Sequence, residues 1–171
     1  MCAAANNSYL ACVLVASDSR SAQKKAELAG PAAKDSLEAL GIHVVEIAVV
    51  PDEIEPLAAK MREWAAREDI HLVVTSGGTG LAPRDVTPEA TQEVIEREVP
   101  GIPEMLRARS LEITPHAALS RARAGVRNRT LIINLPGSPK AVKESVEFLA
   151  PVLPHALETV AGQAVECASP K

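Results

Sequence analysis

Four continuous apolar runs of strand length punctuate the chain, and each one ends in polar or glycine-rich residues. Aliphatic side chains occupy successive positions in these runs, which is the pattern of strands buried on both faces. Antiparallel strands with one solvent-exposed face would instead alternate apolar and polar residues. We therefore expect four buried strands, at residues 10–16, 43–50, 70–75 and 130–135.

The stretches between these runs carry helix signals. Pro31 suits the first turn of a helix that stops at Gly41, and Asp52 opens a D-x-x-E capping pattern ahead of apolar residues at helical spacing. Thr87 followed by a proline is typical of another helix start. Pro151 and a second proline three residues later predict a kink or a split in the last helix. The expected helices are residues 31–40, 52–68, 87–97, 102–110 and 139–161.

Buried strands that alternate with helices predict an α/β fold, with a parallel sheet covered on both faces. A length of 171 residues suits one domain. We expect its core at about residues 10–162, with flexible tails before and after.

Composition narrows the class of protein. Hydrophobic residues make up 47% of the chain and aromatic residues only 2%, so the core is aliphatic and platforms for stacking nucleic-acid bases are scarce. The net charge is −4 and the sequence holds no block of basic residues, which argues against nucleic-acid binding. No run is long enough to predict a membrane span. Cys2, Cys12 and Cys167 are odd in number and widely spaced, which favours a reducing, cytoplasmic setting.

The candidate chemistry lies where the strands end. In open α/β sheets the ligand binds beyond the carboxyl ends of the parallel strands, so we expect the residues that follow the four apolar runs to share one cleft. They are Ser17, Asp18 and Ser19 after the first run, Asp52 after the second, Ser76, Gly77, Gly78, Thr79 and Gly80 after the third, and Pro136, Gly137 and Ser138 after the fourth.

Glycines and hydroxyls at strand ends suit a phosphate-bearing ligand, because backbone N–H groups there are free to face an anion. Neither a Walker loop nor a GxGxxG motif is present. Beside a phosphate, Asp52 and Asp85 are candidate Mg²⁺ ligands. Each acid also has a purely structural reading: Asp52 as a helix cap, and Asp85 as a group that bonds the amides of its own loop. Arg84 and Arg121 are the candidate cations for an anionic substrate.

Several longer motifs carry a family resemblance. TSGGTG (75–80) is followed in order by APRDVTPEAT (82–91), EREVPGI (96–102), ITPHAALSR (113–121) and TLIINLPGSPKAV (130–142). Together they resemble the molybdopterin adenylyltransferases of the MogA/MoaB type, which also form the G domains of gephyrin and the plant molybdenum-cofactor protein. The similarity covers roughly residues 11–161.

The resemblance implies a three-layer α/β/α fold, a homotrimer, and AMP transfer from Mg-ATP to the terminal phosphate of molybdopterin with release of pyrophosphate. It implies that Asp52 and Asp85 are the functional acids and that Ser120 and Asn134, with the strand-end loops, bind nucleotide and pterin. It also implies that backbone N–H groups of residues 77–80 stabilise the charge that develops in the reaction. The product would pass to a second, molybdate-inserting enzyme.

One segment of the sequence departs from the family pattern, so two alternative functions remain. Where many relatives have D-R-S-G-P, this chain has Glu27-Leu28-Ala29-Gly30-Pro31. A non-catalytic molybdopterin-binding or scaffold module of the same fold is therefore the main alternative. A pyrophosphatase related to competence-damage proteins is a weaker one, since those proteins lack the RDVTPEAT and LSR sequences.

Overall fold

The computed structural model describes residues 9–17 and 20–162, and for residues 20–27 it describes the backbone alone. Strands and helices alternate through the first half of the chain, and a short hairpin interrupts that alternation in the second half. The elements are β1 (Tyr9–Ala16), α1 (Arg20–Glu38), β2 (Ile42–Val50), α2 (Ile54–Ala65), β3 (Ile70–Ser76), α3 (Thr87–Val94), β4 (Arg97–Glu98), α4 (Gly101–Leu111), the 3-10 helix η1 (Pro115–Leu119), β5 (Ala124–Arg127), β6 (Thr130–Leu135), α5 (Pro139–Leu149) and α6 (Leu153–Val160).

The strands form one six-stranded sheet in the order β2-β1-β3-β6-β5-β4. The four strands expected from the sequence are confirmed, and they run parallel to one another. β5 and β4 were not anticipated; β5 pairs antiparallel with β6, and β4 pairs antiparallel with β5 at the edge of the sheet. The turn between β5 and β6 contains Asn128 at φ +51°, a left-handed conformation that asparagine tolerates better than most residues.

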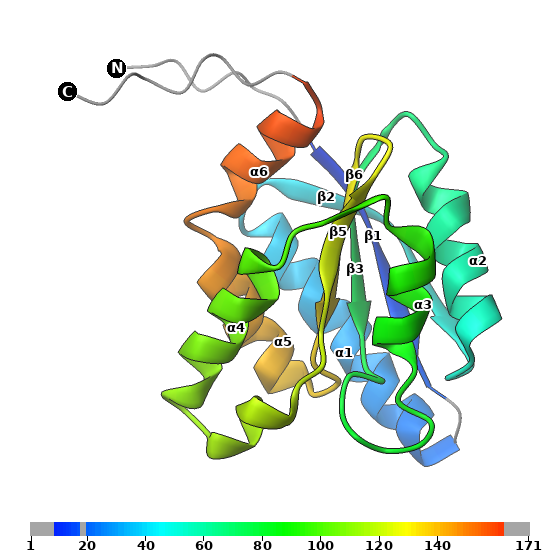
Figure 1. The fold of residues 1–171 in the computed structure, drawn as a ribbon, viewed down its shortest axis with the longest axis vertical. Helices are drawn as coiled ribbons and strands as arrows, with labels where there is room; N and C mark the ends of the chain where they lie inside the picture. The colour runs from blue at the N-terminus through cyan, green and yellow to red at the C-terminus, as the bar shows by residue number, and fades with distance from the viewer. Residues whose placement is uncertain (1–8, 18–19, 163–171) are drawn as a thin grey trace.

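Helices cover both faces of this sheet, so the fold is a three-layer α/β/α sandwich (Figure 1). On one face the core joins β-strand side chains to α1, α4, α5 and α6. On the other face α2 and α3 pack over a second cluster built around Trp64 and Met61. Apart from Tyr9, Trp64, Cys12 and Met61 the buried side chains of these clusters are aliphatic, as the composition indicates.

Four expectations about helix ends were wrong. α1 begins at Arg20, so Pro31 lies inside this helix and not in its first turn. The backbone N-cap of α2 is Glu53 and no side chain caps it, so Asp52 is not the cap of this helix. Likewise Val86, not Thr87, is the N-cap of α3, which ends at Val94 and not near residue 97.

Two other expectations about helices are confirmed. Gly41 follows α1 with φ +78°, and its amide bonds the Glu38 carbonyl, which terminates the helix. The last helix is split into α5 and α6 near Pro151. None of the helices in the described ranges is both long and apolar enough to cross a bilayer.

Candidate functional site

The structure brings the loops at the carboxyl ends of β1, β3 and β6 into direct contact. The Ser76 hydroxyl donates to the Pro136 carbonyl at 2.9 Å, which joins the ends of β3 and β6. A methyl group at Gly77 would lie 2.8 Å from the Ala16 carbonyl oxygen at the end of β1, and one at Gly137 would lie 3.3 Å from the Gly77 Cα. Only glycine permits such close packing of backbone on backbone. These loops occupy the lower end of the molecule in Figure 1.

Most of the glycine loop after β3 presents unbonded amides. Gly77 and Gly78 have φ values of +99° and +63°, which turn the chain sharply out of the strand. The Gly77 amide donates to the Leu135 carbonyl at 3.3 Å, so this amide stabilises the fold and is not available to a ligand. The amides of Gly78, Thr79 and Gly80 donate to no group among the described residues. Three consecutive amides of this kind form a concave donor set for an anion.

Asp52 lies against this loop. Its Oδ1 is 3.1 Å from the position that a Gly78 Cβ would take, and the hydroxyl oxygen of Thr87 lies still closer to that position. Thr87 is fully buried, and within the described part of the chain its hydroxyl has no hydrogen-bond partner. A carboxylate and an unpaired buried hydroxyl beside free amides form an oxygen-rich set that suits Mg²⁺ together with a phosphate.

Asp85 closes the other end of the loop. Its Oδ2 accepts the Ala82 amide at 2.9 Å, and the Asp85 amide donates to the Ala82 carbonyl at 2.9 Å. The same carboxylate oxygen lies 2.8 Å from the position that a Gly80 Cβ would take. The structural role considered for Asp85 is therefore real, and it also holds a negative charge beside Gly80.

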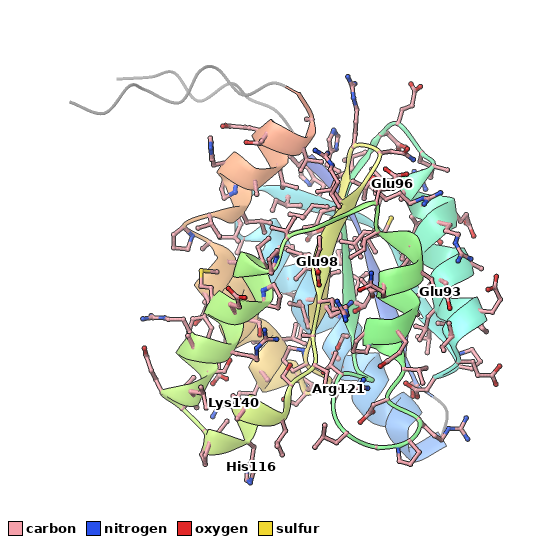
Figure 2. The ribbon with its side chains drawn as sticks, viewed as in Figure 1. Glu93, Glu96, Glu98, His116, Arg121 and Lys140 are labelled. Atoms are coloured by element: carbon pink, nitrogen blue, oxygen red, sulfur yellow. The ribbon has the colours of Figure 1, made fainter. Side chains whose placement is uncertain are left out.

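Arg121 fastens the loop from outside. Its backbone amide donates to the Thr79 carbonyl at 2.9 Å, and its guanidinium donates to the carbonyl oxygens of Gly80, at 2.7 Å, and Asp85. The guanidinium also pairs with Glu89 on α3. Partial burial alone would raise the pKa of Glu89, but the hydrogen bond and the charge of Arg121 hold that pKa below its ordinary value. In Figure 2, Arg121 lies at the same end of the molecule as the loop.

The remaining candidate residues have different surroundings. Asn134 is fully buried and donates to the hydroxyls of Thr75 and Thr91, at 3.0 and 2.8 Å, so it ties the sheet to α3. Ser138 caps α5 by accepting the Ala141 amide, and Arg84 is exposed on the loop. Ser17 is buried at the end of β1, with a hydroxyl that lacks a partner in the described part of the chain. Asp18 and Ser19 lie outside the described residues.

A cavity of about 290 Å³ opens beside the glycine loop, between α4, η1 and α5. Thr79, Gly80, Ser120, Asn134 and Pro136 form the wall toward the loop, so the structure gathers five candidate residues around one space. The sequence had not pointed to the outer wall, most of which is apolar. Its side chains come mainly from the two helices and η1, and they include Leu106, Arg107, Ile113, Leu119, Ala141, Glu144 and Ser145.

Part of that wall had a signal in the sequence. Ala141, Glu144 and Ser145 are spaced i, i+3 and i+4 directly after the PGS loop, which places them on one helix face. The altered stretch of the family motif lies in α1, where Gly30 is buried against Ile47 and Leu28 is exposed. The side chain of Glu27 is outside the described residues.

No group of three or more potential metal-binding side chains occurs in the part of the chain that the structure describes. Mg²⁺ does not require such a group, because it usually binds one or two protein carboxylates and completes its shell with substrate phosphates and water.

Comparison with known proteins places this arrangement in a family. Residues 12–155 match the family described as a probable molybdopterin binding domain, so the chain belongs to that family. The chain is 40% identical over 152 residues to a molybdopterin adenylyltransferase of Helicobacter pylori, an alignment that covers 88% of this chain and 86% of that protein.

Other relatives are longer or known from their structures. The chain is 46% identical over 112 residues to the molybdenum cofactor synthesis protein cinnamon of Drosophila melanogaster, but it spans only 19% of that protein's length. Among solved structures, the molybdopterin biosynthesis enzyme MoaB of Thermus thermophilus superposes with a TM-score of 0.83 at 48% identity, covering 90% of this chain and 97% of that one.

Proposed function

We propose that this protein is a molybdopterin adenylyltransferase of molybdenum-cofactor biosynthesis, which transfers AMP from Mg-ATP to the terminal phosphate of molybdopterin. The observation that carries this proposal is the row of amides at Gly78, Thr79 and Gly80 that have no partner among the described residues. They lie between Asp52 and Asp85, and Thr79 and Gly80 line the neighbouring cavity. The likeness to the Helicobacter pylori enzyme over most of both chains supports it.

The cavity and the loop divide the two substrates between them. An apolar cavity of about 290 Å³ is close to the lower limit for small-molecule sites and suits a fused heterocycle. We place the pterin ring there, because Ser120 and the loop residues that the family resemblance assigns to substrate form its inner wall. The terminal phosphate of the pterin and the triphosphate of ATP then meet at the amides of the loop.

The reaction is a phosphoryl substitution and needs no covalent enzyme intermediate. An oxygen of the molybdopterin phosphate attacks the α-phosphorus of ATP, the bond from that phosphorus to the bridging oxygen breaks, and pyrophosphate leaves. The amides of residues 78–80 stabilise the charge that builds on the α-phosphate, which is the usual role of preorganised donors. Arg121 keeps these amides in place by bonding the loop carbonyls.

Asp52 and Asp85 would hold Mg²⁺ at the triphosphate, where the ion neutralises negative charge. The orphan hydroxyl of Thr87 adds a neutral oxygen on the Asp52 side. Because Asp85 also bonds the Ala82 amide, its charge is fixed in position before any substrate binds.

Incubation of the purified protein with molybdopterin and Mg-ATP tests the proposal, with the AMP-bearing pterin and pyrophosphate as readouts. We expect both products, and we expect chelation of Mg²⁺ to abolish them. Tight binding of molybdopterin without any product would establish the non-catalytic module instead. Pyrophosphate release from nucleotides in the absence of pterin would favour the pyrophosphatase reading.

We further propose a cytoplasmic homotrimer that hands its product to a molybdate-inserting enzyme. Exposed aliphatic side chains on the edge strand β2 and on α1 support self-association, because Leu28, Val45, Ile47 and Val49 are 39–63% exposed in the described part of the chain. Light scattering of Val45→Glu and Val49→Glu variants tests this surface, and we expect the trimer to dissociate.

A further inference from the structure

The outer wall of the cavity carries a single carboxylate in a mostly apolar setting. Among the described residues that line the cavity, Glu144 on α5 is the only acid. Its helix neighbours on this face are Ala141 and the buried Ser145, whose hydroxyl already donates to the Ala141 carbonyl at 2.7 Å. Glu144 is therefore the strongest hydrogen-bond acceptor on this side of the cavity.

Arg107 on α4 supplies the complementary donor. One nitrogen of its guanidinium donates to the Ala122 carbonyl at 3.2 Å, which fixes the side chain beside the cavity. A guanidinium carries five N–H donors, so others remain for a ligand. α4 packs against α5, so the two charged residues come from neighbouring helices of the same wall.

The stability of the fold does not explain Glu144. Among the described residues its one ion pair is with Lys140, at 3.6 Å, and the Lys140 side chain is 81% exposed. Exposed pairs of this kind contribute little to folding. A carboxylate that faces an apolar cavity without a firm partner is costly unless a ligand supplies hydrogen-bond donors.

A pterin ring has the matching edge. Its pyrimidine half presents two adjacent donors, the ring N3–H and the 2-amino group, next to the 4-oxo acceptor. Two donors side by side suit the two oxygens of one carboxylate, and the oxo group suits a guanidinium. We propose that Glu144 selects the pterin by accepting from N3–H and the 2-amino group, while Arg107 donates to the 4-oxo group. This inference rests on the proposed function, since it assumes that the pterin occupies the cavity.

Two small ring compounds test the inference without turnover. A pterin such as 6-hydroxymethylpterin carries the 2-amino donor, and the corresponding lumazine carries an oxo acceptor in its place. The affinities of wild type and Glu144→Gln for both rings would be measured by fluorescence titration near neutral pH. A glutamine amide offers one acceptor and one donor, which matches the lumazine edge and mismatches the pterin edge.

We expect wild type to prefer the pterin by about 10- to 100-fold, the range that charge-assisted hydrogen bonds give. Glu144→Gln should lose most of that preference or reverse it. Glu147→Gln is the matched control, because Glu147 is an exposed residue of α5 that does not line the cavity, and it should keep the wild-type ratio. Unfolding temperatures of both variants should equal that of wild type, which separates recognition from folding.

The outcomes distinguish this inference from the proposed function. If Glu144→Gln keeps the wild-type preference, or if wild type binds neither ring, the role of Glu144 is overturned, even where AMP transfer to molybdopterin proceeds. If the preference switches and no AMP transfer occurs, the recognition role stands and the adenylyltransferase proposal fails. In the active enzyme, Glu144→Gln should raise KM for molybdopterin and leave KM for Mg-ATP unchanged.

Discussion

Gly78 is the position at which one methyl group tests the packing of the glycine loop most directly. Its φ of +63° lies in the left-handed region, where an L-residue costs about 1–2 kcal/mol. An alanine Cβ would also lie 3.1 Å from the Asp52 carboxylate and in overlap with the buried Thr87 hydroxyl. Thr87 is the first residue of α3 and fully buried, so it has little room to move, and such overpacking costs about 1–3 kcal/mol.

Gly78→Ala should therefore lower the free energy of unfolding by roughly 2–5 kcal/mol. For a chain of this size the corresponding drop in Tm is about 5–15 °C, measured by circular dichroism or calorimetry. Substrate turnover should fall as well, because the methyl group displaces Asp52 or the amides beside it.

Gly41→Ala is the matched control. Gly41 has φ +78°, but nothing lies within 4 Å of an added Cβ, so this variant carries the backbone strain without the collision. Both variants lose the same entropy of the unfolded glycine, which cancels in the comparison. If Gly78→Ala and Gly41→Ala unfold at the same temperature, the contact of Gly78 with Thr87 and Asp52 has no energetic weight, and this reasoning about the loop is refuted.

Three other predictions follow from single contacts. In Asp85→Asn the side-chain oxygen can still accept the Ala82 amide, so stability should be unchanged. The kcat for AMP transfer should fall by about 100-fold or more, because the negative charge is lost. Full activity in this variant would show that Asp85 has no role in the mechanism. Thr87→Val removes a buried hydroxyl that lacks a partner in the described part of the chain, so the free protein should be at least as stable as wild type, yet Mg-ATP should raise its Tm less; a loss of stability without ligand would show that the hydroxyl is bonded in solution. Burial lowers the pKa of His71 below its ordinary value of 6.5, and its Nδ1 accepts the Leu10 amide at 3.3 Å, so its contribution to stability should be complete above pH 6.5 and should decline as the pH falls below that value. Denaturant titrations of wild type and His71→Asn across this range measure the decline, which should be smaller in the variant.

The parallel half of the fold was predictable because its strands are aliphatic on both faces. β4 and β5 were not, since they have two and four residues and β4 consists of Arg97 and Glu98. Their strand character comes from pairing, of β5 with β6 and of β4 with β5, which is tertiary information. The early start of α1 was missed because glycine and proline at positions 30 and 31 are signals of a helix boundary, whereas the structure has Pro31 inside the helix and Gly30 packed against Val15 and Ile47.

The part of the site that lies in the loops at the strand ends was predictable from the sequence. Parallel strands deliver their terminal loops to one edge, so the contact between the glycine loop and the PGS loop follows from topology alone. The role of Arg121 was not predictable in this way. The Arg121 guanidinium donates to the carbonyl oxygens of Gly80 and Asp85, which are 41 and 36 residues away in the chain. Every residue has a backbone carbonyl, so the sequence does not indicate which carbonyls the side chain will bind. The outer cavity wall depends on how α4 packs against α5, which no local pattern encodes.

Unsatisfied polar groups concentrate where the substrates are proposed to bind. Four buried side-chain polar atoms lack partners among the described residues, and two of them, the hydroxyls of Ser17 and Thr87, lie at the carboxyl edge of the sheet. The unbonded amides of residues 78–80 lie at the same edge. Each of the two buried hydroxyls costs about 1–3 kcal/mol when it is unpaired, and the aliphatic core offsets this loss of stability. If the proposed substrates bind at this edge, their phosphate oxygens accept from the amides and a bound cation accepts the hydroxyl oxygens as ligands. Binding is then stronger, because these groups gain partners that the folded protein alone does not give them.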